Sequence, residues 1–204
     1  MADIIVAGNT SGAITISAPL VAGSGVLTLP TGTDTLVGKA TTDTLTNKSI
    51  AATQLTGTIA AAALPAGSVL QVVSVNYSVE TTNSTTTYAD TGLTATITPT
   101  SATSKILILI SHPECYKSSG NLSNSLALQI LRGATVISFN TSLGYTGTAM
   151  TLYFSASLNY LDSPATTSAT TYKTQFKNGD FNGALARIQA NSVKSTITLM
   201  EIAV

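Results

Sequence analysis

Residues 149–161 have the sequence AMTLYFSASLNYL, in which Leu152, Phe154, Ala156, Leu158 and Tyr160 alternate with tyrosine, serine and asparagine. Successive side chains of a β-strand point to opposite faces of its sheet, so this period of two predicts a strand with one apolar face. The stretch decides the fold class because the sequence on both sides of it repeats the same signal.

Short segments of this kind follow one another over residues 68–204, and Gly, Asn, Ser and Pro clusters separate them. They are VLQVVSVNYSV (69–79), LTATITP (93–99), SKILILISH (104–112), LALQILR (126–132), ATVISFN (134–140), TYKTQFK (171–177), LARIQA (185–190) and STITLMEIAV (195–204). Short strands at such spacing predict a sandwich, and a jelly roll above all. The fold class is therefore expected to be all-β: a short N-terminal β module, an extended stalk or linker, and a C-terminal jelly-roll-like β-sandwich.

The first 67 residues differ from the rest. Residues 1–40 hold three short alternating runs, at 3–7, 13–18 and 25–30, and strands so short cannot bury much without a partner chain. Residues 41–67 carry one bulky apolar side chain at every fourth or fifth position: Leu45, Ile50, Leu55, Ile59 and Leu64. Such a segment cannot form its own core, so it is either a flexible linker or a stalk in which several chains meet on an axis.

Composition excludes several classes of protein. Charged residues make up 9% of the chain, nine basic against nine acidic, whereas about 25% is usual. A nucleic-acid binder would show a basic excess, so no nucleic-acid partner is expected. About one residue in six is threonine, which suits a pleated surface. No signal peptide is expected, and no apolar run reaches the ~18–20 residues of a membrane span, so no membrane insertion is expected.

Catalytic chemistry has little support in the sequence. The single histidine, His112, precedes Glu114 and the single cysteine, Cys115, which suggests a base or a metal ligand. Metal sites need three or four converging ligands, so the preferred interpretation is a strand-end residue beside a loop. The nine acidic residues are scattered singly, and no phosphate-binding loop, GxSxG or HExxH motif occurs. We expect no enzyme activity, no catalytic residue, no cofactor and no metal.

Recognition is expected from three loops, residues 116–121, 144–147 and 177–182, because they combine aromatic residues with Asn, Ser and Gly, the mixture that adaptable binding loops use. The candidate contact residues are Tyr116, Lys117, Asn121, Tyr145, Asn178, Asp180 and Phe181. The alternative is that these loops are ordinary solvated turns.

Three N-terminal elements carry a resemblance to a known family. They are SGAITISAPLVAGSGVLTLPTGTDTLVG (11–38), TDTLTNKSI (42–50) and QLTGTIAAAALPAGS (54–68). In this order they resemble a repeated module, a stalk element and a linker in fibre and appendage proteins of tailed bacteriophages, particularly marine and cyanobacterial phages. The segments GSVLQVV and TITLMEIAV resemble the first and last strands of terminal β-sandwich domains there. The resemblance covers the first third of the chain well and the remainder only in style.

The resemblance implies a homotrimer assembled in the host cytoplasm and built into the virion. Residues 1–40 would attach to other virion proteins of the capsid or tail, residues 41–67 would form the stalk, and residues 68–204 would display a head domain for adhesion to a host-surface glycan or protein. A capsid decoration protein that stabilises the head shell is the alternative, and a glycan-degrading tail spike is the third interpretation. Head and tail locations both stay open.

Overall fold

The structure is a computed structural model, and it describes residues 4–7, 13–16, 49–51, 57, 59–60, 63–120, 124–179 and 184–204. The chain divides into two compact units, Met1–Thr56 and Gly57–Val204. Within the described residues, no helix is long and apolar enough to cross a membrane.

The first unit contains a β-hairpin. Strands β1 (Ile4–Ala7) and β2 (Ala13–Ile16) pair in antiparallel fashion, with Ile4 opposite Ile16 and Ala7 opposite Ala13. Two of the three predicted N-terminal strands are therefore confirmed. The third, at residues 25–30, lies outside the described residues, as does most of the predicted stalk.

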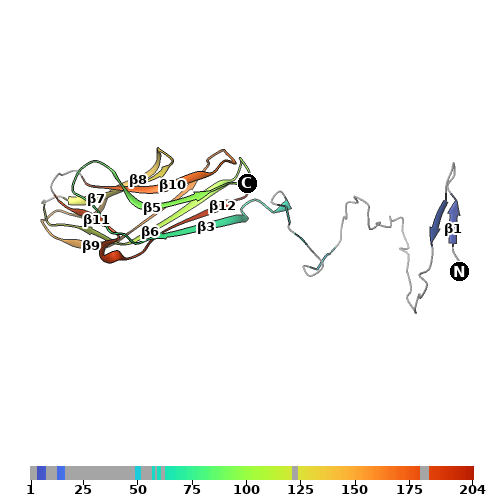
Figure 1. Ribbon diagram of the computed structural model, residues 1–204, viewed down its shortest axis with the longest axis horizontal. Helices are drawn as coiled ribbons and strands as arrows, with labels where there is room; N and C mark the ends of the chain where they lie inside the picture. Colours follow the sequence, from blue (N-terminus) through green and yellow to red (C-terminus); the bar gives the residue numbers. More distant parts are fainter. Residues whose placement is uncertain are drawn as a thin grey trace. The chain divides into compact units, whose positions relative to one another are not determined.

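The second unit is a sandwich of two antiparallel sheets (Figure 1). The first sheet has the strand order β3 (Val69–Tyr77), β12 (Ser195–Ile202), β6 (Lys105–Lys117) and β9 (Leu152–Asp162). The second sheet has the order β5 (Ala89–Ile97), β10 (Thr170–Asn178), β7 (Asn124–Arg132) and β8 (Thr135–Thr146).

Two short strands lengthen the first sheet. Strand β11 (Ala186–Ile188) pairs with the last residues of β6, on the edge where β12 pairs with the earlier residues of β6. Strand β4 (Thr81–Asn83) lies beside β11 as β3 lies beside β12. The two strand positions on this side of β6 are thus each divided into two strands, and the 3-10 turn η3 (Ala190–Ser192) marks the break between β11 and β12.

The pairing defines the topology. The hairpin pairs are nested along the chain: β7 with β8, β6 with β9, β5 with β10, and β3 with β12. The innermost pair turns at Gly133, whose φ of 58° is left-handed and suits glycine. A long hairpin that is rolled so that its strands alternate between two four-stranded sheets is a jelly roll. The predicted all-β, jelly-roll-like sandwich is confirmed.

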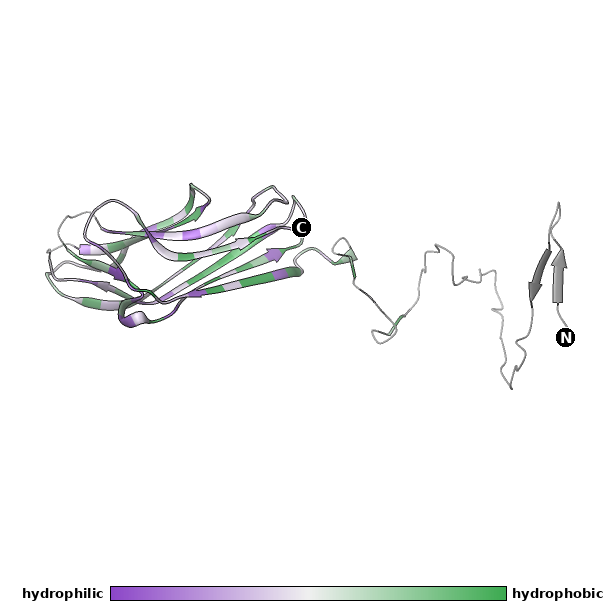
Figure 2. Ribbon diagram, viewed as in Figure 1, coloured by the Kyte–Doolittle hydropathy of each residue, from purple (hydrophilic) through white to green (hydrophobic). Residues whose placement is uncertain are grey.

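Hydrophobic and more hydrophilic residues alternate along the strands (Figure 2), and the buried apolar side chains form two clusters between the sheets. One cluster contains Leu93, Ile97, Ile106, Ile108, Ile110, Ile130, Tyr172, Ile197 and Leu199. A second cluster, towards the other end of the sandwich, contains Cys115, Leu126, Leu128, Phe176, Ala186 and Ile188. Each large apolar side chain contributes about 1.5–3 kcal/mol when it is fully buried.

The predicted position of His112 is wrong. Strand β6 continues to Lys117 rather than ending at His112, and the imidazole is fully buried, with Nδ1 2.7 Å from the Ser195 hydroxyl oxygen. The pairing of β6 with β9 shifts between His112 and Cys115. This bulge inserts one extra residue into β6, since three steps on β6 oppose two on β9, so both His112 and Cys115 point into the sandwich.

Candidate functional site

The described residues of the three predicted recognition loops lie in strands. Tyr116 and Lys117 end β6, Tyr145 belongs to β8, and Asn178 ends β10. The loop expectation does not hold at these four positions. Asn121, Asp180 and Phe181 lie outside the described residues.

The structure nevertheless brings the described residues of the three stretches to one end of the sandwich. The Lys117 ammonium donates to the Thr146 hydroxyl and to the Met150 carbonyl at 3.3 Å. The amide of Ser118 donates to the carbonyl of Leu185 at 2.9 Å, and the side chain of Asn178 donates to the carbonyl of Ala184. This end, opposite to the one where the chain enters, is called the far end below.

Exposure separates these residues into two groups. Lys117 and Asn178 are fully buried, and burial lowers the pKa of the Lys117 ammonium. They hold strands and loops together rather than facing solvent. The side chain of Tyr145 is 58% exposed, and Tyr116 is half-buried on the outer surface of the first sheet.

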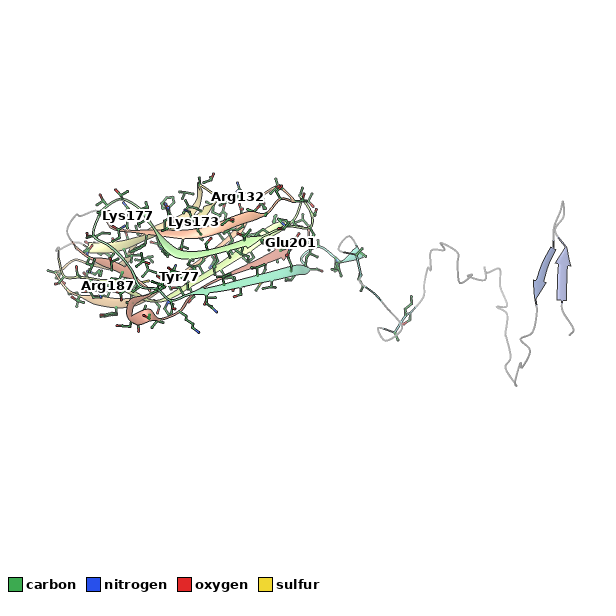
Figure 3. All side chains as sticks on the ribbon, viewed as in Figure 1. Tyr77, Arg132, Lys173, Lys177, Arg187 and Glu201 are labelled. Atoms are coloured by element: carbon green, nitrogen blue, oxygen red, sulfur yellow. The ribbon has the colours of Figure 1, made fainter. Side chains whose placement is uncertain are left out.

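Tyr116 belongs to a row of side chains that crosses this outer surface. It lies opposite Tyr153 on β9 and opposite Arg187 on β11. The rings of Tyr116 and Tyr153 meet edge to face with centroids 5.0 Å apart, and the Arg187 guanidinium lies 4.7 Å from the Tyr116 ring centre. Figure 3 shows Arg187 near the end of the sandwich opposite to Glu201.

Two carboxylates extend this row to the turn η3. Glu80 forms an ion pair of 3.4 Å with Arg187 and accepts the backbone N–H of Asn191 at 3.2 Å. Glu114, in the β6 bulge, accepts the side-chain amide of Asn191 at 2.7 Å. The continuous group Tyr153, Tyr116, Arg187, Glu80, Asn191 and Glu114 is called the turn site below.

The backbone beneath the turn site is strained. Gln189, Asn191 and Ser192 have φ values of 56°, 56° and 58°, so three non-glycine residues within four positions are left-handed. Such residues cost of the order of 1–3 kcal/mol each and persist where the surrounding structure over-determines them, often at functional sites. Asparagine tolerates the conformation better than glutamine or serine.

Unsatisfied polar atoms accompany the strain. Gln189 is fully buried, and neither its side-chain nitrogen nor its side-chain oxygen has a hydrogen-bond partner among the described residues. The Nε of Arg187 also lacks one there. Buried polar groups are nearly always hydrogen-bonded, so this concentration sets the turn apart from the rest of the sandwich.

At the opposite end of the same outer surface lies a row of apolar residues. Met200 of β12 is paired with Val72 on one side and with Leu107 on the other, and Leu107 is paired with Leu161. Val72 and Leu161 are 55% and 49% exposed. A solvated sheet face normally carries polar residues here, as the row Asn76, Thr196, Ser111 and Ser157 does farther along these strands. Val72, Met200, Leu107 and Leu161 are called the apolar row below.

The outer surface of the second sheet has a different chemistry. The side-chain amide of Gln129 donates to the side-chain oxygen of Gln175 at 2.8 Å, and the side-chain amide of Gln175 donates to the Asp90 carboxylate at 2.8 Å. Lys173 pairs with Asp90 at 2.8 Å, and its hydrogen bond is the main cause that lowers the pKa of the Asp90 carboxyl. Phe139, opposite Gln129, is 66% exposed. These side chains satisfy one another and show none of the strain found at the turn site.

The described residues contain no group of three or more His, Cys, Asp or Glu side chains that could hold a metal ion. Burial lowers the pKa of His112 to about 4, and burial raises the pKa of the Cys115 thiol to about 12. Both side chains are therefore uncharged at neutral pH and packed in the interior.

Sequence reasoning identified only Tyr116 among the members of the turn site. Tyr153, Arg187, Glu80, Glu114 and Asn191 lie far apart in the sequence, and no local pattern links them. One usable signal was the Pro113-Glu114 pair in the middle of an apolar run, which is typical of a bulge.

A scan against models of known protein families finds no match to the chain, and a search of curated proteins finds no similar sequence.

Proposed function

We propose that the protein is a non-enzymatic structural component of a tailed-phage virion. In this proposal it is a homotrimeric fibre or appendage that displays the jelly roll for adhesion to the host surface. The N-terminal module attaches to other virion proteins, and the far end of the sandwich faces outward. The order of the three N-terminal sequence elements supports the phage assignment, and jelly rolls are common in viral and lectin domains.

The apolar row is the observation that carries the oligomeric part of the proposal. It crosses all four strands of the first sheet, and its member on β3, Val72, comes three residues after Val69, where the chain enters the sandwich. The row itself contains no charged residue. A sister copy, whose matching surface is equally apolar and uncharged, is therefore its occupant in this proposal.

Light scattering on the purified chain tests the trimer. We expect a mass three times the chain mass of 20.8 kDa, about 62 kDa. Leu107→Glu introduces a charge into the apolar row and should give a folded monomer. Ser111→Glu, four residues farther along the same face of β6, is the matched control and should leave the trimer intact. A wild-type monomer at micromolar concentration would contradict the oligomeric part of the proposal.

Location on the particle separates the two structural alternatives. An antibody or gold label on the chain should mark a small number of positions at the tail or a vertex if the protein is a fibre. Hundreds of marks over the whole shell would favour the capsid decoration protein. Release of reducing ends from host polysaccharide by the purified chain would instead favour the glycan-degrading spike.

A further inference from the structure

The turn site needs an explanation that packing does not supply. Its strained backbone and the unpartnered side chain of buried Gln189 lie in one short segment between β11 and β12, and the carboxylates of Glu80 and Glu114 reach the same segment by accepting hydrogen bonds from Asn191. A connection of this length could avoid the strain with glycine. The sequence QANSV of residues 189–193 contains none.

The exposed groups of the turn site have a defined chemistry. Glu80 and Glu114 offer carboxylate oxygens as hydrogen-bond acceptors, and an ionised carboxylate has about four lone-pair positions. Contacts within the protein occupy two of these positions at Glu80, to Arg187 and Asn191, and one at Glu114, to Asn191. The remaining positions can accept hydrogen bonds from a ligand. Arg187 and the side chain of Asn191 offer N–H donors. The group contains two carboxylates and one guanidinium, so it favours a ligand that donates hydrogen bonds and carries no negative charge.

Tyr153 adds a surface for stacking. Its side chain is 52% exposed and lies on edge strand β9, and its position is fixed by the edge-to-face contact with Tyr116. Because the Arg187 guanidinium lies over the Tyr116 ring, Tyr153 is the ring of this pair that faces solvent more freely. The face of an aromatic ring is electronegative and attracts the polarised C–H groups of a flat ligand.

We propose that the turn site binds a neutral oligosaccharide, with one sugar ring stacked on Tyr153 and the hydroxyl groups of adjoining rings bonded to Glu80, Glu114, Arg187 and Asn191. Sugars combine hydroxyl donors in fixed directions with an apolar C–H face, which is the combination that these residues complement. The inference rests on the proposed adhesive function, because it names the class of host-surface ligand that the displayed domain takes.

The test uses the full-length protein and a printed array of neutral oligosaccharides of glucose, galactose, mannose and their N-acetylated forms. Wild-type protein should bind at least one member, and Tyr153→Ala should weaken that binding about tenfold or more. Tyr153→Phe keeps the ring and should retain the binding. Phe139→Ala removes an aromatic ring of greater exposure from the opposite sheet and should leave the binding unchanged.

Asn191→Gly separates a binding role from a structural one. Glycine relaxes the left-handed backbone, so the variant should be as stable as the wild type or more stable, while it loses binding together with the bond to Glu114. Equal binding by wild type and Asn191→Gly would overturn the assignment of Asn191. No binding to any array member, or binding that Tyr153→Ala leaves intact, would overturn the proposal as a whole.

The outcomes also distinguish this inference from the function on which it rests. If the chain is found on virions as a trimer but binds no saccharide, the inference fails and the structural function stands. If saccharide binding depends on Tyr153 but the chain is not found on virions, the saccharide site stands and the phage assignment fails.

Discussion

Replacing His112 with asparagine should remove most of the acid sensitivity of the sandwich above pH 5. His112 is the only histidine in the chain, and its imidazole is fully buried beside Ser195. Its Nε2 has no hydrogen-bond partner among the described residues. Burial lowers the pKa of His112 from 6.5 to about 4, because the charged form would lose its hydration.

The sign and size of the effect follow from this difference. Between pH 6.5 and pH 4 the unfolded chain binds a proton at His112 and the folded chain does not, so the free energy of unfolding falls as the pH falls. One pKa unit corresponds to 1.36 kcal/mol, which gives a loss of about 2 kcal/mol at pH 5 and about 3 kcal/mol at pH 4 and below. Above pH 6.5 the effect disappears.

Urea unfolding measures this loss. The chain has seven tyrosines and no tryptophan, so tyrosine fluorescence and circular dichroism are suitable signals. Protein concentration must be constant, because a trimer would make the midpoint depend on it. The carboxyls of Asp90 and Glu201 have pKa values below the ordinary 3.8 and 4.5, so their contributions to stability are lost only at lower pH. The difference between wild type and His112→Asn isolates the histidine. A difference that stays constant from pH 7 to pH 5 would refute the reasoning.

Three further predictions concern the sandwich. Gly92→Ala should lower the free energy of unfolding by more than about 1 kcal/mol, because φ is +82° and a Cβ would lie 2.2 Å from the ring of Tyr77; a urea midpoint equal to that of the wild type would contradict this. Tyr172→Phe should cost about 1–3 kcal/mol in the same measurement, because its buried hydroxyl donates to Asp162 at 2.7 Å; a neutral result would show that Asp162 finds another donor. Cys115, which is buried and has a pKa raised by burial to about 12, should react with iodoacetamide only after unfolding, and rapid labelling of the native protein would show that the bulge opens.

The alternation of apolar residues predicted most strands and their buried faces. On β9, Ala156 is buried, and Leu158 and Phe154 pack against the core, as the period of two requires. The end of β6 was missed because Pro113 interrupts the apolar run and cannot donate a backbone hydrogen bond. In the structure Pro113 lies in the bulge, where β6 and β9 are not regularly paired, so the strand continues past it. The carbonyl of Pro113 accepts a hydrogen bond from the hydroxyl of Ser155 at 2.6 Å.

The turn site could not be predicted for a different reason. It depends on which residues of β6, β9 and β11 are opposite one another, and register is a property of the paired strands rather than of any single segment. The exposed position of Phe139 illustrates the same limit. In the segment ATVISFN, the pattern alone does not reveal which face of β8 is outside, and the ring turns out to face solvent.

The way in which the last residues of the chain close the sandwich has a practical consequence. The amide of Ala203 donates to the carbonyl of Ser68 at 2.9 Å, and the amide of Gly67 donates to the carbonyl of Ala203 at 2.8 Å. The C-terminal residues are therefore hydrogen-bonded to the residues at which the chain enters the sandwich. A label fused after Val204 would lie at this entry end of the domain. Among the described residues, the connections 118–120, 147–151 and 184–185 lie at the most distant extremity, so substitutions there are the direct way to alter what the extremity touches without disturbing its attachment.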